Sequence, residues 1–241
     1  LGLETLSSIV KRLPADAGRP IAAVNGDFYA LPSGPTQGDP TSLCIVDGEL
    51  VSGPRWRALW FDRDGKLQLA DVKSKMTVKI GDRDPLPLLI NRGRDKKHAV
   101  LFTPRFGPNT NMKGGLELIL EPARKTNWLP LKVQATIPAR VAGRSVAGDT
   151  RIPADGMVLS LAAEPATKLG AVKKGEAVEI NTMLSHDLSG VKTALGGGPI
   201  LMRDGKLAVK QKKKDPRHPR TAIGCNRSEE RRVGKECATG C

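Results

Sequence analysis

Three copies of one short pattern, an Asp-Gly pair between apolar residues, constrain the fold of this chain more than any other feature. They are VDGELV (46–51), RDGKLQL (63–69) and RDGKLAV (203–209). Asp-Gly readily adopts the positive φ angles of a tight turn, and the apolar residues on either side are typical of strands. The sequence therefore predicts three β-hairpins.

Other apolar stretches extend the strand pattern, whereas helix signals are few. Further strands are expected at 19–29, 98–104, 116–121 and 131–138. The 26 Gly and 18 Pro among 241 residues favour turns over long helices. Helical spacing predicts one helix within 3–13, ended by Pro14, and a second short one within 164–172. We expect a strand-dominated α/β (α+β) single domain with several β-hairpins and few helices.

The chain carries a net charge of +14, which raises the question of nucleic-acid binding. Its basic residues are scattered apart from the run KQKKKDPRHPR (210–220), and that run holds no aromatic side chain for base stacking. The sequence therefore does not favour a nucleic-acid partner, and the charge fits a phosphorylated or acidic glycan equally well. No apolar run is long enough for a transmembrane segment.

The first candidate site lies in AAVNGDFYALPSGPTQGDP (22–40). An apolar strand leads into Asn25, Gly26 and Asp27, which place an amide and a carboxylate at the strand end, where a small residue admits a ligand. An ordinary turn, with Asn25 and Asp27 bonded to their own backbone, explains the same residues about as well.

Two later stretches offer groups that bind anions. In ALGGGPILMRDG (194–205), three successive glycines could present backbone N–H groups to an anion, although a bend between strands is the simpler reading. In DPRHPRTAIG (215–224), Arg220 adjoins an apolar strand and is a natural phosphate partner, whereas Arg217 fits a solvated loop as well.

Metal and disulfide signals are weak. His98 and His186 have no partner at metal-ligand spacing, so no metal site is predicted, and the sequence leaves any cofactor undefined. Cys44 and Cys225 would be able to pair in an exported protein, but two cysteines do not establish that.

Six stretches, taken in order, resemble the phosphodiester glycosidase family, which includes the lysosomal uncovering enzyme (N-acetylglucosamine-1-phosphodiester alpha-N-acetylglucosaminidase). They are AAVNGDFY, HAVLFTPRFG, IPADGMVLSL, KKGEAVEI, ALGGGPILMRDG and HPRTAIG, between about residues 21 and 226. The resemblance implies an α/β fold and hydrolysis of a sugar-1-phosphodiester, with the phosphate left on its acceptor. For bacterial members it implies a periplasmic or secreted location, often near exopolysaccharide metabolism; no signal peptide is visible before Leu1, and a cut there would remove one.

The resemblance also assigns site residues by position. Asp27 would act as an acid/base or orienting carboxylate, Asn25 would hold a sugar hydroxyl, and Arg220 would neutralise the phosphodiester together with the glycine amides. The full substrate-binding set is Gly26, Gly196, Gly197, Gly198, Arg220, Thr221 and Gly224. Glycosidases usually use two carboxyl groups, and the sequence does not point to the second. A non-catalytic module that binds acidic or phosphorylated glycan is the alternative.

The end of the chain departs from the family pattern. After RTAIG, members of the family continue through a DGR segment, a helix and an LDGGGS motif. This chain instead has RSEERRVGKEC (227–237), which resembles a translated sequencing-library adapter. We therefore expect a lead-in at 1–20, an incomplete glycosidase-like domain at 21–226, and a non-native tail at 227–241. The C-terminal part of the fold would then be missing, so activity is not assumed for the fragment.

Overall fold

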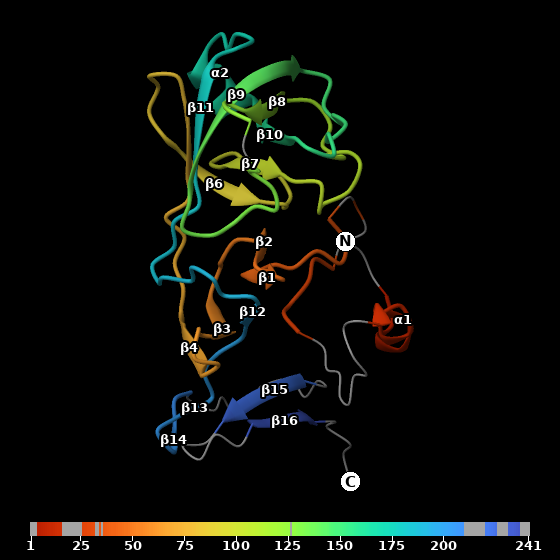
Figure 1. Cartoon of the computed structure of the whole chain (residues 1–241), viewed down its shortest axis with the longest axis vertical. Coiled ribbons are helices and arrows are strands. Elements are labelled where there is room, and N and C mark those ends of the chain that lie inside the picture. The colour runs from red at the N-terminus through yellow and green to blue at the C-terminus, as the bar shows by residue number, and fades with distance from the viewer. Residues whose placement is uncertain are drawn as a thin grey trace.

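A computed structural model describes residues 4–15, 26–31, 34, 36–125, 127–209, 220–225 and 231–236 of the chain. They form two helices and sixteen strands, which confirms the strand-dominated prediction. A closed barrel lies at one end of the molecule and a five-stranded sheet in the middle, with two small hairpins at the other end (Figure 1).

The five-stranded sheet has the order β2-β1-β12-β3-β4, and every pairing in it is antiparallel. Its strands are β1 (Cys44–Val46), β2 (Glu49–Ser52), β3 (Arg57–Phe61), β4 (Leu67–Asp71) and β12 (Ala194–Gly197). Hairpins β1–β2 and β3–β4 confirm two of the three predicted hairpins. In the first, Asp47 (φ 52°) and Gly48 (φ 76°) both have the positive φ that the Asp-Gly pair was expected to supply.

The barrel closes in the order β10-β7-β6-β5-β11-β9-β8, and its only parallel pair is β6–β7 within the described strands. Its strands are β5 (Thr77–Ile80), β6 (Leu86–Ile90), β7 (Ala99–Phe102), β8 (Leu116–Pro122), β9 (Thr136–Ser145), β10 (Met157–Leu161) and β11 (Ala177–Asn181). One apolar cluster includes side chains of both the sheet and the barrel, such as Ile45 and Leu101. The two layers therefore share a core.

Strand β7 is buried on both faces, as its continuous apolar run AVLF predicts. Ala99 and Leu101 belong to the main core, whereas Val100 and Phe102 belong to a second cluster. In that second cluster the Phe102 and Phe106 ring centroids are 4.7 Å apart, because the loop after β7 folds back over the strand.

The predicted helices and the third hairpin are present with shorter bounds. Helix α1 (Leu6–Lys11) begins after Thr5, whose Oγ1 accepts a hydrogen bond from Ser8 N at 3.2 Å, and α2 (Ala163–Leu169) lies within the second predicted segment. The third hairpin is β13 (Met202–Arg203) with β14 (Lys206–Leu207), and a fourth is β15 (Arg220–Cys225) with β16 (Arg231–Glu236).

Two of the predicted strands differ from the structure in their bounds. The strand expected at 131–138 begins only at Thr136, because Gln134 has a φ of 56° and its side chain bonds Leu184 N and His186 O across the turn. Residues 19–25 of the strand expected at 19–29 lie outside the described residues, and in its last part Tyr29 forms only an isolated bridge with Pro40.

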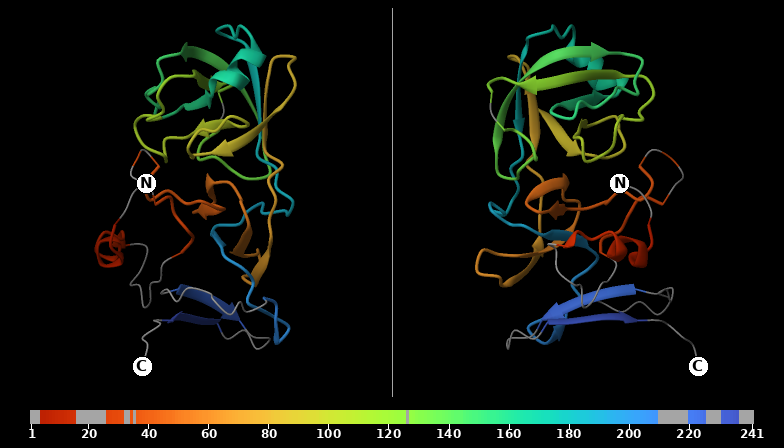
Figure 2. Two further views of the ribbon diagram at one scale, coloured as in Figure 1. Left: turned by 180° about the vertical axis from the view of Figure 1, so that it is seen from behind. Right: turned by 45° about the vertical axis from the view of Figure 1, so that its right-hand side comes forward.

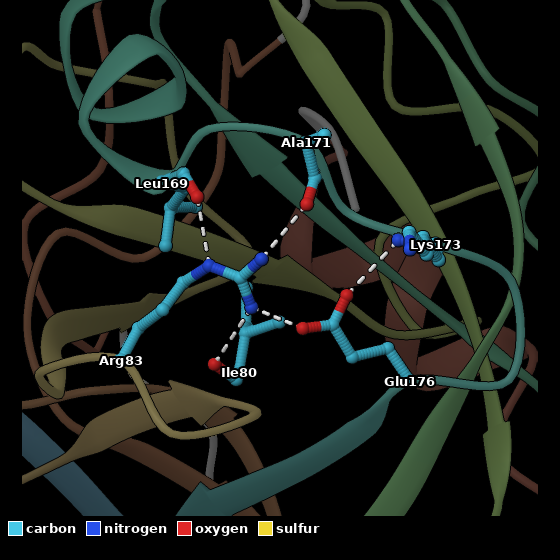
Figure 3. Close-up of polar contacts among 6 residues, drawn as sticks. All are labelled: Ile80, Arg83, Leu169, Ala171, Lys173 and Glu176. Carbon is cyan, nitrogen blue, oxygen red and sulfur yellow. Dashed lines mark hydrogen bonds and ion pairs between the residues drawn. The ribbon is translucent and has the colours of Figure 1, made fainter.

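Arg83 ties the β5–β6 turn to the segment between α2 and β11 (Figure 3). Its Nε donates to Leu169 O at 2.7 Å and its Nη2 to Ala171 O at 2.8 Å, while Nη1 bonds the Glu176 carboxylate. These acceptors belong to the end of α2 and the segment after it, so the cluster fastens that segment to the turn after β5.

Candidate functional site

Asp27 and the glycine motif, predicted separately, lie against each other. Asp27 Oδ1 accepts a hydrogen bond from Phe28 N at 2.7 Å, and Oδ2 accepts one from Ser42 N at 2.8 Å. Gly196, on β12, hydrogen-bonds to Leu43 O at 2.6 Å, so the strand passes directly beside this carboxylate. The two motifs therefore form one site at the edge where residues 26–31 meet the five-stranded sheet.

The surroundings of Asp27 act on its charge in opposite directions. Partial burial raises the pKa of the carboxyl above its ordinary value, while the hydrogen bonds from the Phe28 and Ser42 amides lower it, as does the nearby positive charge of Arg92. Burial has the largest effect, so the net change in pKa is upward. A carboxylate with a raised pKa is a stronger base than an ordinary aspartate.

Arg92 comes to this site from the barrel, at the end of β6. Its Nε donates to Ser52 Oγ at 3.1 Å, and its Nη2 bonds Gly53 O. Burial and the positive charge of Arg55 lower the pKa of Arg92 to about 10, and Asp27 opposes that change. At neutral pH Arg92 is therefore a cation facing Asp27.

Asn91 sets the direction of Arg92. It is fully buried and has a φ of 48°, a left-handed conformation that asparagine tolerates better than most residues. Its Nδ2 donates to Val51 O at 2.9 Å and to Thr103 Oγ1 at 3.0 Å, and its Oδ1 accepts from Thr103 N at 2.9 Å. These bonds fasten the end of β6 to the sheet, so Arg92 points toward it.

Arg92 was not among the site residues that the sequence predicted. The one available signal was the position of Asn91 and Arg92 directly after the apolar run of β6, where a polar residue ends a buried strand. Nothing in the sequence pairs Arg92 with Asp27, because the two come from different layers of the fold.

Two buried polar atoms in the segment that follows Asp27 lack partners among the described residues. Ser42 Oγ and Asp39 Oδ2 make no hydrogen bond with the described residues, although Ser42 lies near enough to Asp27 to lower its pKa slightly. Burial raises the pKa of Asp39 to about 6. Burial also raises the pKa of the Cys44 thiol to about 11, so this free cysteine is neutral at physiological pH and is a poor nucleophile.

The remaining predicted residues fall in three places. Asn25 lies outside the described residues. Gly26 and Gly198 flank the site: β-carbons there would contact Leu195 at 3.5 Å and Phe28 at 3.6 Å, whereas one on Gly197 would meet open space. Arg220, Thr221 and Gly224 are on β15, which pairs with β16 at the end of the molecule opposite the barrel (Figure 2). The Arg220 side chain lies outside the described part of the structure.

Other features of the described surface do not mark a site. One surface hollow is lined by Arg83, Ala171, Lys173, Lys174 and Glu176, and another lies along β8 and β9. Neither hollow includes Asp27, Arg92 or Gly196. No group of His, Cys, Asp and Glu side chains in the described part is arranged to hold a metal ion. Neither described helix has the length and hydrophobicity needed to span a bilayer.

Comparison with known proteins supports the family resemblance. Residues 132–233 match the phosphodiester glycosidase family model. The matched range includes the glycine motif beside Asp27 and residues 220–225, whereas Asp27 and Arg92 precede it. A search of the curated proteins finds no match to the chain.

Solved structures share the fold. A hypothetical protein from Synechocystis superposes with a TM-score of 0.65 at 18% identity, over 91% of this chain and 40% of that one. A Burkholderia pseudomallei K96243 protein whose name predicts export superposes with a TM-score of 0.59 at 16% identity, over 85% of this chain and 51% of that one. The chain thus spans about half, or less, of the length of these proteins, and similarity at this level of identity concerns the fold alone.

Proposed function

We propose that the phosphodiester glycosidase fold of this chain serves to hydrolyse a sugar-1-phosphodiester, with Asp27 at the reacting centre. The observation that carries the proposal is the contact between Asp27 and the glycine strand β12, which belongs to the range matching the family. A partly buried carboxylate beside a cationic arginine suits a reaction that develops negative charge on a phosphate.

In this reaction Asp27 acts as the base. A water molecule attacks the anomeric carbon and gives its proton to the Asp27 carboxylate. The bond between that carbon and the bridging oxygen breaks, and its electron pair leaves with the phosphate. A phosphate monoester is stable as an anion at neutral pH, so its departure requires no protonation by a second carboxylic acid. This accounts for a site in which no described Asp or Glu contacts Asp27.

Asp27→Asn tests the role of Asp27. In the natural full-length protein, we expect hydrolysis of a glucosyl-1-phosphodiester, followed as released glucose, to fall by about a hundredfold or more, since an amide accepts no proton. Asp62→Asn is a matched control, because Asp62 Oδ1 also accepts two backbone hydrogen bonds, from Asp64 N at 3.0 Å and Lys66 N at 2.9 Å, at the β3–β4 turn. Full activity of the folded Asp27→Asn protein would rule out this role.

A non-catalytic module that binds phosphorylated or acidic glycan is the second candidate. Only one carboxylate, Asp27, faces Arg92 among the described residues, and binding alone would need no more than this. Binding of a sugar phosphate with no release of sugar by the natural full-length protein would favour it. In either case we propose a periplasmic or secreted location, in keeping with glycan substrates of the cell envelope.

A further inference from the structure

Two exposed aromatic rings stand beside Asp27. Phe28 is 51% exposed and Trp56 is 44% exposed, yet their ring centroids are 6.1 Å apart in an edge-to-face arrangement. Phe28 directly follows Asp27, and Gly198 leaves its ring uncovered on one side, since even a β-carbon there would only reach ordinary contact distance. Large aromatic side chains fixed in mutual contact but open to solvent are typical of a binding surface.

Two arginines adjoin these rings. The Arg55 guanidinium carbon lies 4.5 Å from the centroid of the Trp56 ring. Arg55 is also close enough to Arg92 that their positive charges repel each other. The hydrogen bonds of Arg92 use Nε and Nη2, which leaves Nη1 without an acceptor among the described residues. Five residues thus form a closed ring in which each is a neighbour of the next: Asp27, Arg92, Arg55, Trp56 and Phe28.

The charges within this ring of five residues are unbalanced. Arg92 interacts with one carboxylate, that of Asp27, and with the like charge of Arg55, and no carboxylate among the described residues forms an ion pair with Arg55. Two guanidinium groups that repel each other are stabilised by an anion that both can contact, and phosphate oxygens match the planar fork of arginine.

We propose that Arg55 and Arg92 bind the phosphate, and Phe28 and Trp56 the sugar ring, of a glycan phosphate in one subsite beside Asp27. This inference rests on the proposed function, because it assigns the two halves of the same substrate. The apolar face of a pyranose ring packs on an aromatic ring, and a phosphate on its anomeric carbon would then lie beside the arginines.

Equilibrium binding tests the subsite without requiring hydrolysis. Calorimetric titrations at low salt would use three probes: α-glucose 1-phosphate, glucose and inorganic phosphate. The variants are Arg55→Met and Arg92→Lys for the anion, and Trp56→Ala for the sugar. Arg55 makes no described hydrogen bond, so Arg55→Met is expected to fold even if Arg92→Lys loosens the Ser52 and Gly53 contacts.

Two controls come from the same sheet. Arg57→Met removes an arginine that pairs with Asp71 at 3.1 Å, and Leu69→Ala removes an exposed apolar side chain of similar accessibility, 43%. Both positions lie on β3 and β4 and belong to no part of the ring around Asp27. Each control should bind all three probes as the unmodified chain does.

We expect Arg55→Met and Arg92→Lys to weaken α-glucose 1-phosphate and inorganic phosphate about tenfold or more while leaving glucose unchanged. Trp56→Ala should weaken α-glucose 1-phosphate and glucose but not inorganic phosphate. Three results would each overturn the subsite. The first is phosphate binding that neither arginine substitution weakens, and the second is no binding of α-glucose 1-phosphate at all. The third is tighter binding of a single-stranded oligonucleotide than of the sugar phosphate.

These outcomes are separable from the fate of the proposed reaction. Binding with the expected dependence, but without hydrolysis of a glucosyl-1-phosphodiester, would retain the subsite and reject the reaction. Hydrolysis that is unaffected by Arg55→Met and Trp56→Ala would retain the reaction and reject the subsite.

Discussion

Gly196 lies so close to Asp27 that a β-carbon on Gly196 would stand 2.8 Å from Asp27 Oδ2. The same β-carbon would stand 2.1 Å from Ser42 Cβ, closer than side-chain atoms ever approach. Glycine is required here for space rather than for an unusual φ. The first and second motifs of the sequence are therefore coupled by steric fit.

Gly196→Ala is expected to displace Asp27 or Ser42 and to lower the free energy of unfolding by about 1–3 kcal/mol, the usual cost of overpacking. Urea unfolding measures the change. Gly197→Ala is the matched control on the same strand, because its β-carbon would meet nothing within 4 Å. Equal stability of the two variants would show that β12 does not pack against Asp27 as described.

Asn91 offers a second test, of the joint between barrel and sheet. Asn91→Ala should lower the free energy of unfolding by about 3 kcal/mol or more, since buried partners lose hydrogen bonds and alanine is strained at this φ. Asn91→Gly should recover about 1 kcal/mol of this because glycine accepts a positive φ.

Asp47→Ala is the control for the Asn91 variants. Asp47 has a similar φ, 52°, but lies in an exposed turn, so only the backbone strain should appear there. If Asn91→Ala costs no more than Asp47→Ala, the hydrogen bonds of Asn91 do not hold the layers together.

The raised pKa of Asp39 predicts that the stability of the protein depends on pH. Its pKa in the folded protein is about 6, above the ordinary 3.8, because the residue is only 4% exposed and Oδ2 lacks a donor among the described residues. The folded state keeps a proton that the unfolded chain releases, so the free energy of unfolding falls as the pH rises from about 4 to about 6. The fall is at most about 3 kcal/mol.

Asp39→Asn removes the titrating group and should flatten this part of the profile. Urea unfolding of both proteins at several pH values checks it. A decline of the same size in the Asp39→Asn protein would assign the titration to another carboxyl group.

Residues 227–241 are expected to add little to the stability of the barrel and sheet. Strands β15 and β16 pair with each other and with no other described strand. Deleting 227–241 should therefore shift the melting temperature by less than about 2 °C, measured by calorimetry, which corresponds to about 1 kcal/mol or less. A much larger drop would show that the tail is part of the folded protein.

The local structure was predictable where a short pattern determines it. Asp47-Gly48 and Asp204-Gly205 have positive φ at both residues, as the hairpin pattern requires, and AVLF forms a strand buried on both faces. Gln134 was not predictable, because its left-handed conformation depends on hydrogen bonds to Leu184 and His186, which are distant in the sequence.

The candidate site was predictable only where one short motif contains the residue. Asp27 and Gly196 were each found from their own motif, but their contact depends on β12 entering the sheet between β1 and β3. Arg92 was missed because its loop has no distinctive composition, and its role follows from the buried turn at Asn91. The place assigned to Arg220 comes from the resemblance and stays a prediction, since its side chain is not described.

The position of β12 has a consequence for the order of folding during synthesis. All seven barrel strands are encoded between β4 and β12, so the barrel can assemble while the sheet still lacks its central strand. Asp27 is translated before every barrel strand, yet β12, the strand beside it, emerges from the ribosome only after the last barrel strand. The Asp27 carboxylate is thus translated before the barrel and gains its β12 neighbour only after it.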